Sequence, residues 1–213
     1  YVMGILNVTP DSFSDGGEYP TLDRAILRVE QMVREGADIV DVGGESTRPG
    51  SDVVGAEEEK RRVIPVIRAI RDRFFELPIS IDTQKAEVAE DALAAGADVV
   101  NDVSALRFDP QMVDCVSKRR VPVILMHMQG MPKTMQDSPF YRDVVGEIVE
   151  FLKQRIDFAV GGGVAIDKII VDPGIGFGKT LDHNVEIFRR LRELEGLGRP
   201  VMVGHSRKSM WGA

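Results

Sequence analysis

The sequence predicts an α/β fold built on a parallel sheet, and two patterns support this prediction. Short apolar runs alternate with longer amphipathic segments along the whole chain. Most of these runs are continuous and β-branched, without polar alternation, which is typical of strands buried on both faces. The seven predicted strands are Val2–Leu6, Asp38–Val42, Ile79–Asp82, Asp98–Asp102, Val121–His127, Lys168–Asp172 and Pro200–Gly204.

The segments between the strands have the periodicity of amphipathic helices. In Leu22–Val33 the apolar residues recur at the i, i+3, i+4, i+7 spacing of one helical face. Lys85–Ala95 and Leu181–Leu194 have similar stripes. Gly36 and Gly96 follow the first two of these helices, where glycine suits the left-handed residue that ends a helix.

A short echo in the sequence indicates that one helix-to-strand geometry is used twice. The stretch GADIVD at Gly36–Asp41 recurs as GADVVN at Gly96–Asn101, 60 positions later. Two βα units of about 30 residues each fit that interval.

A closed barrel is favoured over a doubly wound open sheet. No Gly-x-Gly-x-x-Gly turn follows the first strand, and polar residues stand at many strand ends rather than at one crevice. We therefore predict a TIM (β/α)8 barrel, of which seven strands are present. Residues 1–213 are expected to form a single barrel domain, truncated at both ends, because the chain opens at Tyr1 inside an apolar run and stops soon after the seventh strand.

Composition limits the classes of partner. The formal net charge of -7 implies no broad basic surface, so no nucleic-acid partner is expected, although local cations and backbone amides can still hold a phosphate. No apolar run approaches the roughly 20 residues that span a membrane. The single cysteine, Cys115, suits a cytoplasmic location and is expected to be a small buried side chain in the helix-like stretch Gln111–Lys118.

Polar residues gather where the predicted strands end. In a βα barrel the carboxyl ends of the strands meet at the face that carries the active site. A single aspartate there is more often a helix cap or a loop anchor, but a whole set favours a site, since buried polar groups are costly unless paired or used. The set comprises Asn7, Asp41 with Gly43–Gly44, Asp82, Asn101, Asp102, His127, Asp172 and the group Ser206–Lys208.

Three segments rich in turn residues follow strands and would lie over the barrel mouth: Asn7–Gly17, Gly43–Gly50 and Asp172–Lys179. Glycine permits close approach of backbone to a ligand, and mobile loops of this kind can act as lids. The alternative is that they are simple polar turns, and for Asp172–Lys179 the two interpretations have equal weight. The widest irregular stretch is Met128–Phe140, which is expected to be a long loop.

Several of these segments resemble the signatures of one enzyme family. The sequence GILNVTPDSFSDGG at Gly4–Gly17 resembles the first signature of the dihydropteroate synthases, and DVGGESTRPG at Asp41–Gly50 resembles the second. Later signatures match LMHMQG at Leu125–Gly130, DPGIGFGK at Asp172–Lys179 and GHSRKS at Gly204–Ser209. The likeness runs along the whole chain.

The resemblance implies a fold, a reaction and a cofactor. The family has a TIM barrel and condenses 6-hydroxymethyl-7,8-dihydropterin pyrophosphate with para-aminobenzoate, giving 7,8-dihydropteroate and pyrophosphate with the help of Mg²⁺. Sulfonamide drugs occupy the para-aminobenzoate site. A homodimer is also implied.

Roles for individual residues follow from the resemblance and agree with their chemistry. Asp82 and Asp172 can accept hydrogen bonds from the amino and N–H groups of a pterin, and Asn101 can both donate and accept. By resemblance, these three residues form the pterin pocket with Lys208, and Met126 packs on the ring, although a methionine there could also be ordinary core.

The resemblance also implies roles at the leaving group and at the second substrate. Asn7 takes part in binding Mg²⁺ and pyrophosphate, and Asp11 could stabilise a cationic methylene carbon. Asn7, Asp11 and Lys208 are therefore the candidate catalytic residues. The candidate residues for para-aminobenzoate and its loops are Thr47, Arg48, Pro49, Phe177 and Ser206.

The chain departs from the family pattern at one place. Known members carry an Arg-x-His motif at the eighth strand that helps to bind pyrophosphate, and the sequence ends before any such motif. His127, His183 and His205 are read as structural or neighbouring residues, because three scattered histidines do not form a metal site.

Two other functions stay open from the sequence. One is another pterin-binding barrel, such as a methyltetrahydrofolate:corrinoid methyltransferase, which would not need the Asn7–Gly17 loop or the Ser206–Ser209 group. The other is a binding module without turnover, because an incomplete barrel exposes unpaired strand edges.

Overall fold

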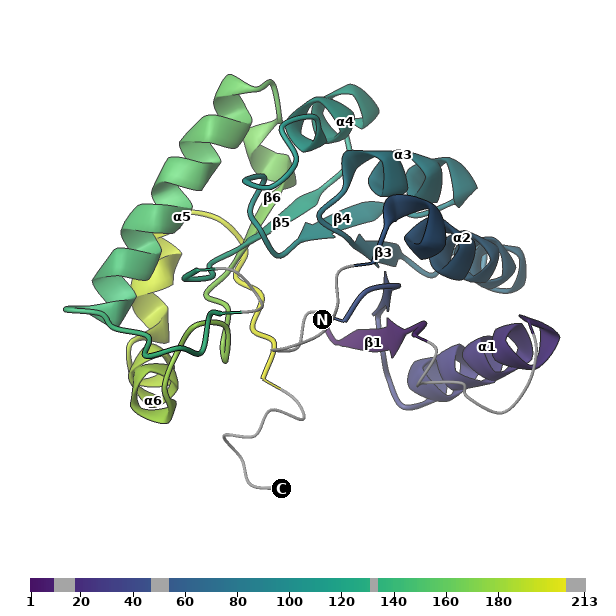
Figure 1. The fold of residues 1–213 in the computed structure, drawn as a ribbon, viewed down its shortest axis with the longest axis horizontal. Coiled ribbons are helices and arrows are strands. Elements are labelled where there is room, and N and C mark those ends of the chain that lie inside the picture. Colours follow the sequence, from purple (N-terminus) through teal and green to yellow (C-terminus); the bar gives the residue numbers. More distant parts are fainter. Residues whose placement is uncertain (10–17, 47–53, 131–133, 206–213) are drawn as a thin grey trace. The chain divides into compact units, whose positions relative to one another are not determined.

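The computed structural model describes residues 1–9, 18–46, 54–130 and 134–205. Strands and helices alternate along the chain, as predicted (Figure 1). The strands are β1 (Met3–Asn7), β2 (Ile39–Gly43), β3 (Ile79–Asp82), β4 (Val99–Asp102), β5 (Val123–Met126) and β6 (Ile169–Asp172). The helices are α1 (Glu18–Arg34), α2 (Ala56–Arg73), α3 (Ala86–Ala95), α4 (Met112–Arg119), α5 (Val144–Gly161) and α6 (Leu181–Arg189), with short 3₁₀ helices η2 (Ile166–Lys168) and η3 (Leu191–Leu197).

The described residues form two compact units: residues 1–9, 18–46 and 54–101 in the first, and residues 102–130 and 134–205 in the second. In the first unit β1, β2, β3 and residues 99–101 of β4 pair in parallel and in chain order. Helix α1 packs on β1 and α2, while α2 packs on β2 and α3. The predicted parallel α/β arrangement is confirmed in this unit.

The core of the first unit is aliphatic. Val40 and Val42 of β2 are fully buried, and the buried stripe of α2 includes Val63, Ile67 and Ile70 at the i, i+4, i+7 spacing. Each fully buried side chain of this size contributes about 1.5–3 kcal/mol relative to an exposed one. This packing explains why continuous β-branched runs became strands.

The sequence echo corresponds to one structural device used twice. Gly36 and Gly96 both have positive φ (99° and 117°) and end α1 and α3. The aspartate two residues later then accepts a backbone N–H at the start of the neighbouring strand: Val2 donates to Asp38 at 2.7 Å, and Ile79 donates to Asp98 at 2.9 Å. The echo therefore sets the start of strand pairing in both βα units.

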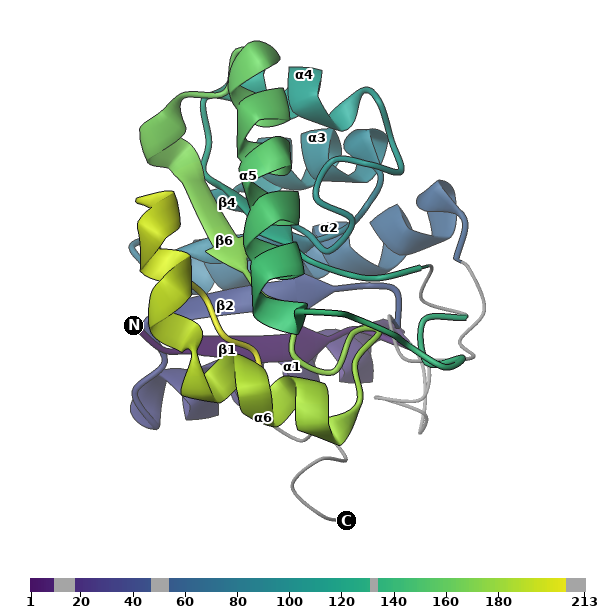
Figure 2. The same cartoon turned by 90° about the vertical axis from the view of Figure 1, so that its left-hand side faces the viewer.

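The second unit contains a parallel pair, β5 and β6, in the register Val123↔Ile169 to Met126↔Asp172. Helix α5 packs on β5 and against α6 and η3, and Figure 2 shows α5 and α6 from the side. Cys115 is buried in α4, as predicted.

The structure differs from the sequence prediction at three places. The predicted strand Pro200–Gly204 is a single bridge between Val201 and Val171 in the described residues. The predicted helix Leu181–Leu194 is divided at Arg190 into α6 and η3. The strand predicted at Ile79–Asp82 has the same bounds in β3. The strands β1, β2, β4, β5 and β6 are trimmed or shifted by one or two residues relative to the prediction, because burial marks a strand but not its last hydrogen bond. Between β5 and α5, the described residues form turns, bends and irregular backbone, as expected for a long loop.

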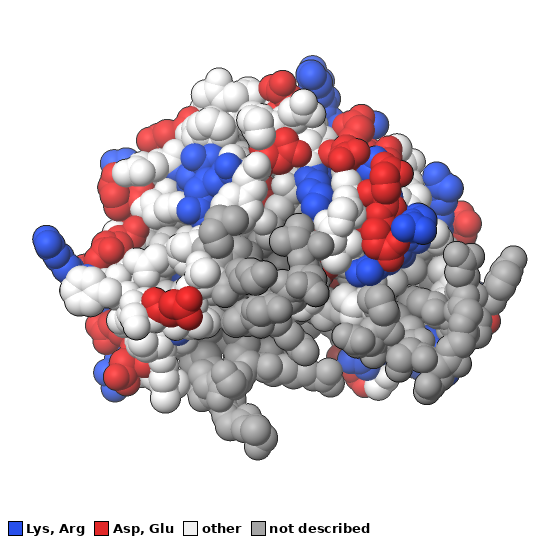
Figure 3. Space-filling model, in the orientation of Figure 1, with Lys and Arg blue, Asp and Glu red and all other residues white. Residues whose placement is uncertain are grey.

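Charged side chains of both signs are intermingled over the face that Figure 3 shows. Among the helices within the described residues, none combines the length and the apolar character that a membrane span requires.

Candidate active site

Four polar or small residues line up at the carboxyl ends of the strands in the first unit. Asn7 of β1 pairs with Gly43 of β2, Gly43 pairs with Asp82 of β3, and Asp82 pairs with Asn101 of β4. Side chains in register on parallel strands project from the same face of a sheet. The register therefore brings the predicted residues Asn7, Asp82 and Asn101 to one row.

Gly43 leaves space between two acceptor oxygens of this row. A Cβ atom at Gly43 would lie 3.5 Å from Asp82 Oδ2 and 3.6 Å from Asn7 Oδ1. Any side chain there would fill the space that the amide and the carboxylate border. Asn7 itself is exposed at the end of β1.

Asn101 is the buried member of the row, and a neighbouring carboxylate fixes its orientation. Only 6% of Asn101 is exposed, and its Nδ2 donates to Asp41 Oδ2 at 3.0 Å. Asn101 Oδ1 is a buried side-chain atom without a hydrogen-bond partner among the described residues. Such an atom costs about 1–3 kcal/mol in the free protein, a cost that a ligand donating to it would remove.

Asp41 was counted among the strand-end residues of the sequence but was given no role. Burial raises the pKa of its carboxyl above the usual range, while hydrogen bonds with Ser80 and Asn101 lower it. The signal for Asp41 was an acid inside an otherwise apolar strand, two positions before Gly43 and hence on the same face.

In the second unit, β5 and β6 bring Met126 and Asp172 into register. Met126 is buried in a cluster with Val103, Met128 and Met135, and Phe177 packs against this cluster. Asp172 Oδ1 accepts the N–H of Gly174 at 2.7 Å. Three predicted site residues of this unit therefore lie at the carboxyl ends of two paired strands and in the loop after β6: Met126, Asp172 and Phe177.

His127 follows β5 and is buried. Its Nδ1 lies 2.9 Å from Lys179 Nζ, and its ring contacts Phe151 edge-on at a centroid distance of 4.9 Å. Burial lowers the pKa of His127 well below its ordinary value, and the cations of Lys179 and Arg107 lower it further. His183 completes a capping box with Thr180 at the start of α6. Both histidines have structural contacts of the kind that the sequence predicted.

An ion-pair cluster beside the Gly43–Gly50 segment was not predicted from the sequence. Lys85 Nζ lies 2.5 Å from Glu45 Oε2 and 2.5 Å from Glu59 Oε2, and Glu59 is fully buried. Glu45 Oε1 also accepts the N–H of Val54 at 3.1 Å. Glu45 and Val54 flank residues 46–53, so this cluster ties both ends of that segment to the N-termini of α2 and α3. Its residues come from distant parts of the chain, so no local sequence pattern predicts the cluster.

Six predicted site residues lie outside the described residues. They are Asp11, Thr47, Arg48, Pro49, Ser206 and Lys208.

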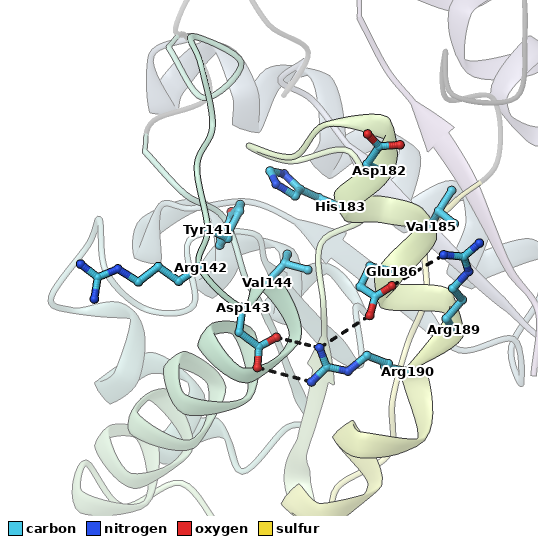
Figure 4. Close-up of a pocket in the computed structure, with 10 residues that line it drawn as sticks. All are labelled: Tyr141, Arg142, Asp143, Val144, Asp182, His183, Val185, Glu186, Arg189 and Arg190. Atoms are coloured by element: carbon cyan, nitrogen blue, oxygen red, sulfur yellow. Dashed lines mark hydrogen bonds and ion pairs between the residues drawn. The ribbon is translucent and has the colours of Figure 1, made fainter.

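A separate hollow of about 470 Å³ lies on the surface between the start of α5 and α6 (Figure 4). It contains none of the predicted site residues. Three of its charged residues are paired with one another, since Arg190 contacts Asp143 at 2.8 Å and Glu186 at 3.7 Å. The strand ends, not this hollow, carry the candidate chemistry.

Comparison with known proteins assigns the family. The sequence profile of the pterin-binding enzymes matches residues 3–213. A dihydropteroate synthase of Synechocystis is 51% identical over 212 residues, covering 100% of this chain and 73% of the relative. The dihydropteroate synthase of Escherichia coli is 49% identical and covers 100% of this chain and 74% of the relative. The chain thus spans about three quarters of the length of these relatives.

Solved structures agree with the sequence relatives. The Xanthomonas albilineans dihydropteroate synthase with 4-aminobenzoic acid has a TM-score of 0.91 at 50% identity, over 99% of this chain and 74% of that one. The chain belongs to the pterin-binding enzymes, within the dihydropteroate synthase family, and has their TIM-barrel fold. Its activity is that of a transferase in folate biosynthesis, which joins the pterin of 6-hydroxymethyl-7,8-dihydropterin pyrophosphate to para-aminobenzoate with release of pyrophosphate.

The lowered pKa of His127 makes the stability of the protein depend on pH. The unfolded state binds a proton on His127 below its ordinary pKa of about 6.5, whereas the folded state does not. The free energy of unfolding should therefore fall as pH drops below about 6.5, by up to about 1.4 kcal/mol per pH unit, until the folded-state pKa is reached. Urea unfolding of wild type and His127→Gln between pH 7.5 and 5.5 measures this contribution as a difference in slope. Parallel pH profiles for the two proteins would contradict it.

The Glu45–Lys85–Glu59 cluster should matter more for stability than a nearby exposed cluster. Lys85→Met leaves a buried carboxylate without its cation and is expected to cost about 3 kcal/mol. Lys60→Met is the matched control, because Lys60 also joins α2 to α3 but its partners Glu87 and Asp91 are exposed. That change should cost much less than Lys85→Met, because solvent screens ion pairs between exposed groups. Urea unfolding of both variants tests this, and equal losses would refute the distinction.

Proposed function

We propose that this dihydropteroate synthase recognises the pterin ring with Asp82, Asn101 and Asp172, with Lys208 donating to ring acceptors and Met126 packing on the ring. The observation that carries the proposal is the buried Oδ1 of Asn101, which has no hydrogen-bond partner in the described part of the chain, while the Asn101 Nδ2 donates to Asp41. A pterin edge presents amino and ring N–H groups, and these are the donors that carboxylates and an amide oxygen accept.

The oxygen chemistry at the end of β1 suits Mg²⁺ and pyrophosphate. Asn7 offers an exposed amide oxygen beside the Gly43 gap. Among the residues that the structure describes, no three His, Cys, Asp or Glu side chains come together as a metal site. This fits a Mg²⁺ ion that keeps several waters and relies on substrate phosphates, with Asn7 as its protein ligand. When bound, Mg²⁺ would supply positive charge to the departing pyrophosphate.

In the proposed mechanism the protein acts mainly by positioning. The bond between the pterin methylene carbon and the pyrophosphate oxygen breaks first, and the bonding electrons leave with the pyrophosphate. The methylene carbon becomes electron-poor and is stabilised by the pterin ring, which Asp82, Asn101 and Asp172 hold in place. The amine of para-aminobenzoate then attacks this carbon and loses a proton. Little covalent work is required of side chains, so orientation and electrostatics supply most of the acceleration.

The remaining residues are also assigned positioning and electrostatic roles. Asp11 is proposed to stabilise the cationic methylene carbon. Phe177, Pro49 and the stem of Lys208 flank the ring of para-aminobenzoate. Thr47 and Ser206 meet its polar ends, and Arg48 orders the second loop. Of this group, Phe177 lies within the described residues, where it packs on the Met126 cluster.

We further propose that the enzyme is a cytoplasmic homodimer. A single, buried cysteine suits a reducing compartment, and the dimer is implied by the family resemblance. Sedimentation of the purified gene product at one subunit mass would exclude the dimer.

Pyrophosphate release by the whole gene product tests the site assignment. With the pterin pyrophosphate, para-aminobenzoate and Mg²⁺, release should require both substrates. Asp82→Ala should lower kcat/KM about 100-fold, because a charge-assisted hydrogen bond is lost in a dry pocket. Asp91→Ala is the control, because Asp91 is an exposed partner of Lys60. Wild-type activity in Asp82→Ala would remove Asp82 from the pterin site.

A further inference from the structure

The loop between β6 and α6 is folded around a buried ammonium group. Lys179 is only 3% exposed. Its Nζ donates to the carbonyl oxygens of Gly174 and Phe177, each at 2.9 Å, and lies 2.9 Å from His127 Nδ1. The carbonyl oxygen of His127 is a further acceptor at 3.4 Å.

Glycine makes this arrangement possible. Gly174, Gly176 and Gly178 all have positive φ (68°, 79° and 62°), a region that other residues rarely adopt. A Cβ atom at Gly174 would lie 1.9 Å from the carbonyl oxygen of His127. The loop therefore approaches the chain after β5 more closely than any side chain would allow.

Other backbone groups of the same loop form hydrogen bonds with side chains outside it. The carbonyl of Gly178 accepts from the Tyr141 hydroxyl at 2.8 Å, and the carbonyl of Gly176 accepts from Gln136 Nε2 at 2.6 Å. Asn184 Oδ1 accepts the Gly176 N–H at 2.9 Å. Backbone groups thus alternate between the Lys179 ammonium and outer partners. Such a loop is fixed before a ligand binds, which argues against the lid that the glycine pattern allowed.

The loop holds two residues of the proposed site. The N–H of Gly174 is bonded to Asp172 Oδ1 at 2.7 Å, which fixes the rotation of that carboxylate. The Phe177 N–H is bonded to the Gly174 carbonyl at 3.0 Å, and the Phe177 ring packs on the Met126 cluster. Because Lys179 binds the carbonyls of both Gly174 and Phe177, its ammonium links the two turns that carry these side chains.

Burying a cation is costly, and an apolar side chain could fill the same volume more cheaply. The neutral His127 and the carbonyl dipoles solvate the ammonium in place of water. An apolar side chain could not hold several carbonyl oxygens at fixed positions, whereas the Lys179 ammonium does, and this explains why a charged group is buried here in spite of its free-energy cost.

We propose that Lys179 is a positioning residue for the synthase reaction: it acts as an internal cation that sets the β6–α6 loop, and thereby Asp172 and Phe177, before the substrates bind. This inference rests on the proposed function, because Asp172 and Phe177 are assigned there to the pterin and to para-aminobenzoate. No contact of Lys179 with either substrate is required.

Steady-state kinetics of Lys179→Met and Lys179→Arg in the whole gene product test the proposal. Lys179→Met should raise KM for both substrates and lower kcat/KM about 10- to 100-fold, because small displacements of binding groups are costly. Lys179→Arg retains the cation and should recover part of the loss. Lys168→Met is the matched control at the opposite end of β6 and should behave as wild type. A folded Lys179→Met protein with wild-type KM values and only a lower Tm would overturn the proposal.

Hydrogen exchange keeps the proposal testable if Lys179→Met does not fold. In the wild type without substrates, the amides of Gly174, Gly176 and Phe177 should be protected, and substrates should change this little. Exchange at the rate of an unstructured peptide would overturn the proposal. Asp172→Ala and Phe177→Ala test the substrate-binding roles separately from the role of Lys179. Wild-type KM values in both variants would reject the proposed binding roles of Asp172 and Phe177. Loss of amide protection in a Lys179 variant would show that Lys179 holds the loop, whatever the loop residues bind.

Discussion

The register of the parallel strands is the constraint on which the candidate site depends. Asn7, Gly43, Asp82 and Asn101 occupy equivalent positions at the carboxyl ends of four neighbouring strands, so their side chains share one face. A shift of one residue in any strand would turn its polar residue toward the helices. This register begins where Asp38 accepts the N–H of Val2, just before β1, and where Asp98 accepts the N–H of Ile79, the first residue of β3. Local sequence thereby controls the position of side chains that act several residues further along.

Buried polar groups near the strand ends are handled in two ways. Lys179 and the Glu45–Lys85–Glu59 cluster satisfy most of their charge internally and hold loops in place. Asn101 satisfies only part of its hydrogen-bonding capacity, because its Oδ1 has no partner among the described residues. The first kind of group is expected in a rigid support and the second in a ligand pocket. On this basis Lys179 is proposed to position the site and Asn101 to bind the substrate, although Glu59 Oε1 also has no partner among the described residues.

The sequence predicted the alternation of strands and helices, the polar strand ends and the family, because each is written in local patterns or long signatures. It did not predict which charged side chains are buried together. Lys179 and His127 are 52 residues apart, and Lys85 and Glu45 are 40 apart, so their pairing depends on folding that no periodicity reports. The break in the helix at Arg190 was missed because the apolar stripe continues through it into η3. The glycines alone could not show whether the β6–α6 loop is mobile or fixed, because glycine occurs both in mobile turns and in tightly packed ones.

Titration calorimetry with two ligands tests the central claim most directly, namely that buried acceptor oxygens at the strand ends read the pterin edge. The ligands are a dihydropterin and an analogue that lacks the 2-amino group, each added to the whole gene product. A site built to accept that group's hydrogens should bind the analogue at least about 100-fold more weakly, because the acceptors would be left buried and unpaired. Equal affinities for the two ligands would contradict the account and leave the ring held by packing alone.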